Sequence, residues 1–131
     1  GLEQELTLAE VLEWELKALL SMKTNKLDEA EKHIQKAVEL EDKTRYEPGP
    51  PVVLKPSHEI YGEILLAKGN YQEAIRQFDL SLQRAPNRSQ SLLGKYRALK
   101  KAGESQKAAQ IKTILMKNWE GADEQAKKMV E

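Results

Sequence analysis

The residues with the most evident capacity for chemistry are His58 and Glu59, in the stretch KPSHEIYGEILLAKGNY. A helical H-E-x-x-H motif would place two imidazoles on one face beside a glutamate, as a zinc hydrolase requires. Four residues after His58 the chain has Gly62 instead of a second histidine. The GNYQEAI that follows is typical of a tight turn opening a second helix, so the stretch predicts a helical hairpin.

Other catalytic arrangements find no support in the residue types. The only other histidine, His33, lies four residues after Glu29, which predicts an ordinary exposed helix pair. The chain has no cysteine, which removes disulfides, thiol nucleophiles and Cys-ligated metals, and no serine, histidine and aspartate form a nucleophile motif. We therefore predict no catalytic residue, no metal and no cofactor. A metal site or enzyme built from the two histidines and assorted carboxylates is the least favoured alternative.

The amino-acid composition limits the classes of protein to which the chain can belong. A length of 131 residues predicts a single domain, and 40% hydrophobic residues suffice for a core. The 21 basic residues balance the 21 acidic ones, so no overall field draws the chain to nucleic acid or to an anionic membrane. No apolar run approaches the roughly 20 residues that span a bilayer, and the N-terminus lacks a signal-peptide pattern. We expect a soluble protein, cytoplasmic by default, without membrane insertion; export of a longer precursor stays open.

Apolar residues spaced by three and four predict helices throughout, interrupted by Gly, Asn and Pro. Thr7 and Glu10 suggest a capping box at the first helix, while four of the five prolines predict a loop at 43–56. His58 is expected to pack against that loop or the preceding hairpin. The first expected helix runs from Thr7 to about Met22, the second ends near Asp42, the third runs from Pro56 to Lys68, and the fourth runs from Asn70 to about Arg84. The fifth ends at Gly103 and the sixth runs towards Trp119. A short tail helix is expected at 122–131.

The hairpins repeat along the chain. Ala74 and Ala108, each near the start of a second helix, are 34 residues apart, whereas Ala30 and Ala74 are 44 apart because the proline loop adds length. A period of 34 is that of tetratricopeptide repeats, and the sequence resembles this family between about Val11 and Trp119. The structural signature residues are Trp14, Ala18, Leu27, Ala30, Ile34 and Ala37 in the first unit, Gly62, Gly69, Tyr71, Ala74, Phe78 and Pro86 in the second, and Gly103, Ala108 and Leu115 in the third.

The resemblance implies an all-α, right-handed superhelical stack of about three antiparallel hairpins, with units at about 11–42, 55–88 and 89–119. The third unit departs from the pattern, because Tyr96 stands at the small position and Lys112 where an aromatic is usual. This departure suggests that the third unit acts as an end cap. The KPSHE stretch is also similar to tetratricopeptide regions of poorly characterised bacterial proteins. Small residues at Gly62 and Ala74 would let two helices approach closely, so Gly62→Leu is expected to overpack the hairpin.

In this family the first helix of each hairpin lines a concave groove that binds peptides, so the resemblance implies a protein or peptide partner and a non-catalytic interaction scaffold. By motif position the groove residues are Leu12, Glu15, Leu19, Met22, Glu59, Glu63, Leu66, Ala67, Gln90, Leu93, Arg97, Lys100 and Lys101. We expect apolar contacts from Leu19, Leu66 and Leu93 and charge selection by Glu59, Glu63, Arg97 and Lys101. Either Glu63 and Arg97 pair with each other, which is the favoured reading, or a partner supplies basic groups at one end and acidic groups at the other.

One known activity of the family is disfavoured, and three further hypotheses remain open. Chaperone-tail binders of the family use a lysine and asparagine clamp, and Glu15 and Leu19 at those positions argue against that activity. A short solenoid has apolar ends that could stack or swap, so the runner-up function is a homo-oligomerisation module. In the loop, Arg45, Pro48 and Pro51 fit a proline-motif ligand. Alternatively, the three hydrophobic residues at 52–54 fold back over the hairpins and narrow the groove, which is the role we favour.

Overall fold

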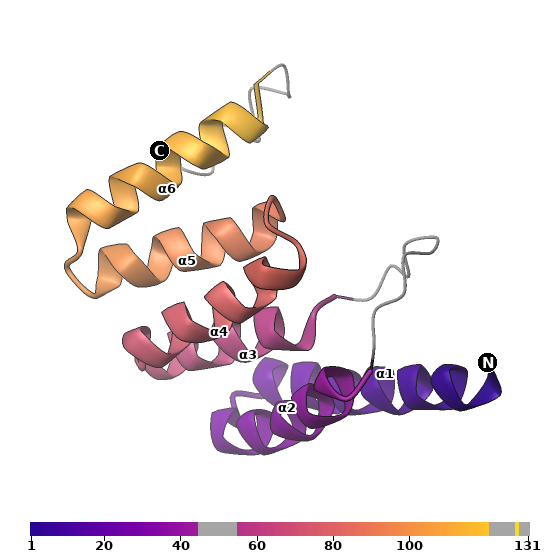
Figure 1. Cartoon of the computed structure of the whole chain (residues 1–131). Helices are drawn as coiled ribbons and strands as arrows, with labels where there is room; N and C mark the ends of the chain where they lie inside the picture. Colours follow the sequence, from indigo (N-terminus) through magenta and orange to yellow (C-terminus); the bar gives the residue numbers. More distant parts are fainter. Residues whose placement is uncertain (45–54, 121–127, 129–131) are drawn as a thin grey trace.

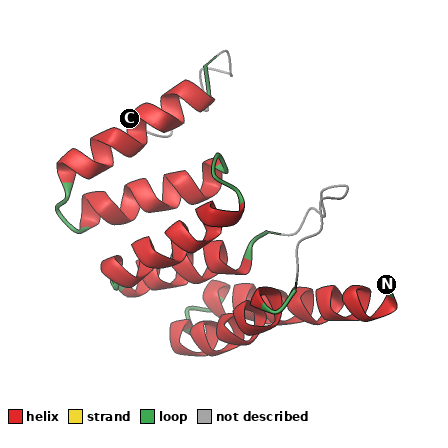
Figure 2. Ribbon diagram, in the orientation of Figure 1, coloured by secondary structure: helices red, strands yellow, loops and turns green. Residues whose placement is uncertain are grey.

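The computed structural model describes residues 1–44, 55–120 and 128, and all of the regular structure in these residues is helical. The helices form three consecutive antiparallel hairpins stacked one above another (Figures 1 and 2). They are α1 (Leu2–Lys23), α2 (Leu27–Asp42), α3 (Ser57–Lys68), α4 (Tyr71–Arg84), α5 (Ser89–Lys101) and α6 (Ser105–Asn118). The predicted all-helical stack is confirmed. Within the described residues, each helix is too short or too polar to cross a lipid bilayer.

The helix ends agree with the sequence in part. Gly69 and Gly103 follow α3 and α5 with φ angles of 83° and 80°, in the left-handed region that glycine tolerates without strain. The predicted start of the first helix at Thr7 was wrong, because α1 begins at Leu2 and the Thr7 hydroxyl donates to the Glu3 carbonyl within the helix. Asn70 occupies the N-cap of α4 as expected, although its side chain makes no capping hydrogen bond.

The first junction, between the first and second hairpins, contains aliphatic residues of several helices. Ile60 and Ile64 of α3 are fully buried against α1 and α2. Their neighbours there are small or aliphatic, which lets the backbones approach. The neighbours are Val11, Ala18, Ala30, Ile34 and Ala37.

The second junction, between the second and third hairpins, is organised by one aromatic side chain. Phe78 of α4 is fully buried with Leu65, Ala74 and Ala98. A Cβ added to Gly62 would lie 2.8 Å from the Phe78 ring, and one added to Gly94 would lie closer still. The ring therefore needs a glycine on α3 and another on α5. The sequence pointed to Gly62 but not to Gly94.

Several predictions lie outside the described residues. These are the proline-motif contacts Arg45, Pro48 and Pro51, the fold-back of residues 52–54, and the tail helix at 122–131, of which Lys128 alone is described. The division of the chain into units 11–42, 55–88 and 89–119 stays a prediction.

Candidate functional site

The residues expected to line a groove lie on α1, α3 and α5, and α3 contacts both of the other first helices. We call this set the first-helix surface. The structure divides it into an exposed part and a buried part. The exposed members are Leu12, Leu19, Ala67, Gln90, Arg97, Lys100 and Lys101; Met22, Glu63 and Leu66 are half-buried; Glu15, Glu59 and Leu93 are buried.

Glu59 is directed into the molecule, with a side-chain exposure of 0%. Arg88 binds its carboxylate with two nitrogens, Nε at 2.7 Å and Nη2 at 2.9 Å, and the Ser91 hydroxyl donates at 2.6 Å. This bidentate pairing raises the pKa of Arg88. In this conformation the Glu59 carboxylate joins α3 to α5 and does not face a partner.

Glu63 forms an ion pair with a lysine that precedes α3. The Lys55 ammonium lies 2.8 Å from the Glu63 carboxylate and 3.8 Å from that of Glu59. Burial raises the pKa of Glu63, and the hydrogen bond from Lys55 opposes that effect. The favoured pairing of Glu63 with Arg97 was therefore wrong, because Lys55 occupies the position beside the carboxylate.

The first helix of the third hairpin, α5, carries exposed basic groups. Arg97, Lys100 and Lys101 are exposed, and within the described part of the chain none of them has a carboxylate partner. Lys100 lies over the Tyr96 ring, with its ammonium 5.5 Å from the centroid. Arg97 and Lys101 are four residues apart on one helix, so their like charges repel. The first-helix surface is consequently basic at its α5 end.

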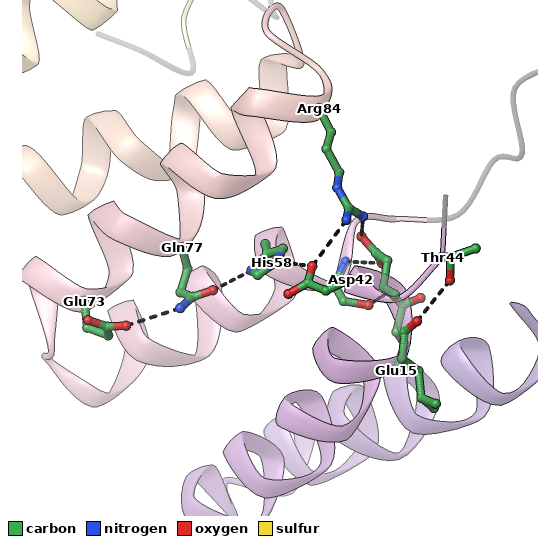
Figure 3. A network of polar contacts seen from close by, with 10 residues as sticks. Glu15, Asp42, Thr44, His58, Glu73, Gln77 and Arg84 are labelled. Carbon is green, nitrogen blue, oxygen red and sulfur yellow. Dashed lines mark hydrogen bonds and ion pairs between the residues drawn. The ribbon is translucent and has the colours of Figure 1, made fainter. Parts of the chain in front are cut away.

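Glu15 is the most strongly perturbed carboxyl group of this surface. It is 2% exposed, and the Ser57 hydroxyl donates to it at 2.8 Å. Burial raises its pKa to about 7, and the nearby Glu41 carboxylate acts in the same direction. Glu41 in turn accepts the Ser57 amide at 2.9 Å. These contacts fasten the start of α3 to α1 and α2 (Figure 3).

His58 bridges the first and second hairpins (Figure 3). Its Nε2 lies 2.8 Å from Asp42 and its Nδ1 lies 2.7 Å from Oε1 of Gln77, whose amide nitrogen donates to Glu73. The two ring nitrogens thus connect α2, through Asp42, to α4, through Gln77. His58 thus contacts the preceding hairpin as expected, although it does so by hydrogen bonds.

Next to this network, Arg84 reaches both Glu41 and Asp42 at 3.4 Å. The other histidine, His33, stacks on Trp14 with ring centroids 5.7 Å apart, so the expected exposed pair with Glu29 was wrong. Among the described residues, no three His, Cys, Asp or Glu side chains cluster in a way that could hold a metal ion.

Most of the signature residues of the repeat are buried or half-buried. Ala18, Ala30, Ala74, Phe78 and Ala108 are buried in the cores, and Trp14 and Tyr71 are half-buried. Pro86, in the turn after α4, is exposed.

Comparison with known proteins identifies the family. Residues 14–44 and 56–88 match the sequence profile described as "Tetratricopeptide repeat", so these two segments of the chain are tetratricopeptide repeats. The solved structure of a TPR-like protein (CT2138) from Chlorobium tepidum TLS has a similar fold, with a TM-score of 0.68 and 15% sequence identity. The match covers 97% of this chain and 91% of that chain. No curated protein matches the sequence. Tetratricopeptide repeats generally mediate protein–protein interactions, and the fold is typically a non-catalytic scaffold.

Sequence reasoning missed the residues that neutralise the buried carboxylates. Arg88 is 29 residues from Glu59, and nothing local links the two. Lys55 lies before the start of α3, so the helical spacing of opposite charges did not point to its 2.8 Å contact with Glu63. Ser57 and Ser91 occupy equivalent positions at the starts of α3 and α5, and both donate to buried glutamates.

Proposed function

We propose that the chain is a non-catalytic protein-interaction scaffold whose first-helix surface binds a partner segment carrying acidic and apolar side chains. The observation that carries this proposal is the exposure of Arg97, Lys100 and Lys101 without carboxylate partners among the described residues. A segment with acidic groups would relieve the repulsion between Arg97 and Lys101.

The sequence also suggested a basic partner segment for Glu59 and Glu63, and the geometry argues against that part. Both carboxylates already have cationic neighbours, Arg88 and Lys55. A basic segment would have to displace those neighbours, leaving buried charges to be paired again. The charge selection is therefore proposed to be for acidic side chains alone, at the α5 end.

Apolar contacts are proposed for the other end of the surface. Leu12 and Leu19 of α1 are exposed, and Leu66 of α3 is half-buried beside Ala67. Leu93, expected to touch a partner, is buried in the third hairpin and would support the surface from beneath. The preferred segment would thus place apolar side chains over α1 and α3 and acidic ones over α5.

The test is selection of peptides from a random display library on the 131-residue chain and on an Arg97→Glu/Lys101→Glu variant. Enrichment of Asp or Glu together with Leu, Ile or Phe is expected on the wild type. On the variant the selected charge should reverse to Lys or Arg. Binding of the selected acidic peptides should weaken as salt is raised, because the contact is exposed.

A matched control carries the same change of charge elsewhere. Lys107→Glu/Lys117→Glu on α6 alters the net charge equally, at exposed positions of a second helix that are outside the first-helix surface. It should leave the selected sequences unchanged. Identical selection by all three proteins would overturn the proposal, as would a charge reversal produced by the α6 variant.

A further inference from the structure

A half-open groove of about 350 Å³ lies between α4, α5 and α6, which follow one another in the stack in Figure 1. Its floor is apolar: Leu99 of α5 is buried, and Ile75 of α4 and Ile111 of α6 are half-buried. We call it the α4–α6 groove. The described residues that line it are all outside the first-helix surface. Its volume is within the range of small-ligand pockets, roughly 300–1,000 Å³.

The first junction shows how the chain fills the equivalent place between α2 and α3. The Tyr61 hydroxyl of α3 donates to Glu31 at 2.9 Å and accepts from Gln35 at 3.0 Å, both on α2. The Tyr61 ring packs against the cores on both sides of α3. Lys68, at the end of α3, lies 2.7 Å from both Asp28 and Glu31. On this side a phenol ring and a lysine therefore cover the first junction.

The second junction places a lysine where the first has the tyrosine. Lys95 follows Tyr61 by 34 residues, and Asp79 follows Gln35 by 44, which are the offsets between the corresponding units. The Lys95 ammonium lies 2.7 Å from Asp79, so it reaches α4 as the Tyr61 hydroxyl reaches α2. Lys95 and Asp79 both line the α4–α6 groove. The groove is therefore at the place that a phenol ring fills in the first junction.

The polar partners of the first junction are also replaced. Ile75 stands in the place of Glu31, and Ala102 stands in that of Lys68. The carboxylate and the ammonium that cover the first junction thus become an isoleucine and a methyl group. These replacements leave an apolar surface in the groove, where a ring would be stabilised by removing apolar area from water.

The polar groups at the rim favour an uncharged ligand. The charged ones already form ion pairs, which are Asp79 with Lys95 at 2.7 Å and Glu104 with Lys107 at 3.2 Å. The amides of Gln72 and Gln110 are exposed, and neither has a hydrogen-bond partner among the described residues. A charged ligand would compete with the ion pairs, whereas a neutral hydroxyl can exchange hydrogen bonds with either amide.

We propose that the α4–α6 groove binds the side chain of a tyrosine supplied by a partner protein. The ring would lie over Ile75, Leu99 and Ile111, as the Tyr61 ring lies in the first junction. The apolar floor accounts for the ring, the paired charges for a neutral ligand, and the open side for its attachment to a polypeptide. This second contact does not depend on binding at the first-helix surface.

The test is titration of the isotopically labelled 131-residue chain with p-cresol, which is the tyrosine side chain as a free molecule. Two-dimensional amide NMR spectra should show saturable shifts around the groove in α4, α5 and α6, with a dissociation constant on the order of 1 mM. Shifts that do not saturate, or that lie mainly away from the groove, would overturn the proposal.

Two variants give the groove residues of the first junction. Lys95→Tyr adds a ring whose hydroxyl can donate to Asp79, and Ile75→Glu places a carboxylate on the apolar floor. Each should bind p-cresol at least about tenfold more weakly than the wild type. Their far-UV circular dichroism should be unchanged, because Lys95 and Ile75 are half-buried. Undiminished binding by either folded variant would contradict the groove as the site.

The matched control is Lys36→Tyr, which makes the same change at an exposed position of α2. It should bind p-cresol like the wild type, and it should shift the same amides. A loss of binding in this control would show that the effect of Lys95→Tyr does not come from filling the groove, and it would overturn the assignment.

Two further probes test the ligand chemistry. p-Toluenesulfonate has the same ring with a negative charge in place of the hydroxyl, and it should bind more weakly than p-cresol. N-acetyl-tyrosinamide carries the flanking amides of a tyrosine within a polypeptide, and it should bind about as tightly as p-cresol. Equal or tighter binding of the sulfonate would contradict the preference for a neutral ring. Much weaker binding of N-acetyl-tyrosinamide would show that the groove takes a free phenol and not a residue of a partner protein, which would overturn the proposed occupant.

Discussion

The two junctions occupy equivalent places in the stack but differ in chemistry. In the first junction, hydrogen bonds from Ser57 and His58 to carboxyl groups of the first hairpin accompany two isoleucines packed among alanines. The second junction depends on Phe78, whose ring fills the space left by two glycines. The stability of a polar junction depends on the ionisation of its side chains, whereas that of an aromatic junction depends on how well the ring fills its space. We therefore expect the two junctions to respond to different perturbations.

The largest effect on stability is expected when the large side chain that fills each junction is removed. Phe78→Ala should lower the free energy of unfolding by about 3–5 kcal/mol, because it leaves a large cavity between α3, α4 and α5. Ile34→Ala, at the equivalent position of the first junction, should cost about 2–4 kcal/mol, since less volume is removed. Urea unfolding followed by circular dichroism measures both. An Ile34→Ala loss equal to or larger than that of Phe78→Ala would contradict the contrast.

A somewhat smaller effect is expected from filling one of the glycine positions. Gly94→Ala should destabilise the chain by about 1–3 kcal/mol, because the added methyl group meets the Phe78 ring. In a Phe78→Leu background the same change should cost much less, as the ring is gone. A double-mutant cycle measures this coupling, and strictly additive losses would show that the ring is not what requires the glycine.

The smallest of these effects is expected in the first junction and depends on pH. The pKa of Glu15 is about 7 in the folded chain, against about 4.3 when unfolded. Between these values the folded state holds a proton that the unfolded state has lost, so raising the pH across this window removes stability. Glu15→Gln should remove that loss, and it should make the chain more stable than wild type by at least about 1 kcal/mol at pH 8 and no more stable at pH 4.

Thermal unfolding of the wild type and Glu15→Gln from pH 4 to pH 8 measures this difference. Glu13→Gln, two residues earlier on an exposed part of α1, is the matched control and should follow the wild type. The same pH profile for Glu15→Gln and the wild type would show that the buried carboxyl group is not the source of the dependence.

The sequence predicted the fold well because period and spacing are local signals. The 34-residue offset, the glycines after α3 and α5 and the proline-rich interruption located all six helices. Gly94 was missed because repeat alignment placed Tyr96 at the small position, although a glycine inside a helical pattern is itself a sign of close backbone approach.

The binding surface was harder to foresee. Motif position placed Glu15 and Glu59 on the first-helix surface but did not say which way their carboxylates would point. Glu15 is held by Ser57, 42 residues away, and Glu59 by Arg88, 29 residues away. Contacts at such separations leave no periodic trace in the sequence. Only the tertiary structure shows which charged groups are occupied and which remain available.

The position of Phe78 between two glycines also limits how freely hairpins of this chain can be exchanged. A foreign repeat grafted after α4 would need a glycine at the place of Gly94, and a hydroxyl donor for Glu59 at the place of Ser91. Hairpins with the usual aliphatic residue at the first place would be held away from the ring. Chimeric arrays built from this protein should therefore tolerate a new module before α3 more readily than one after α4.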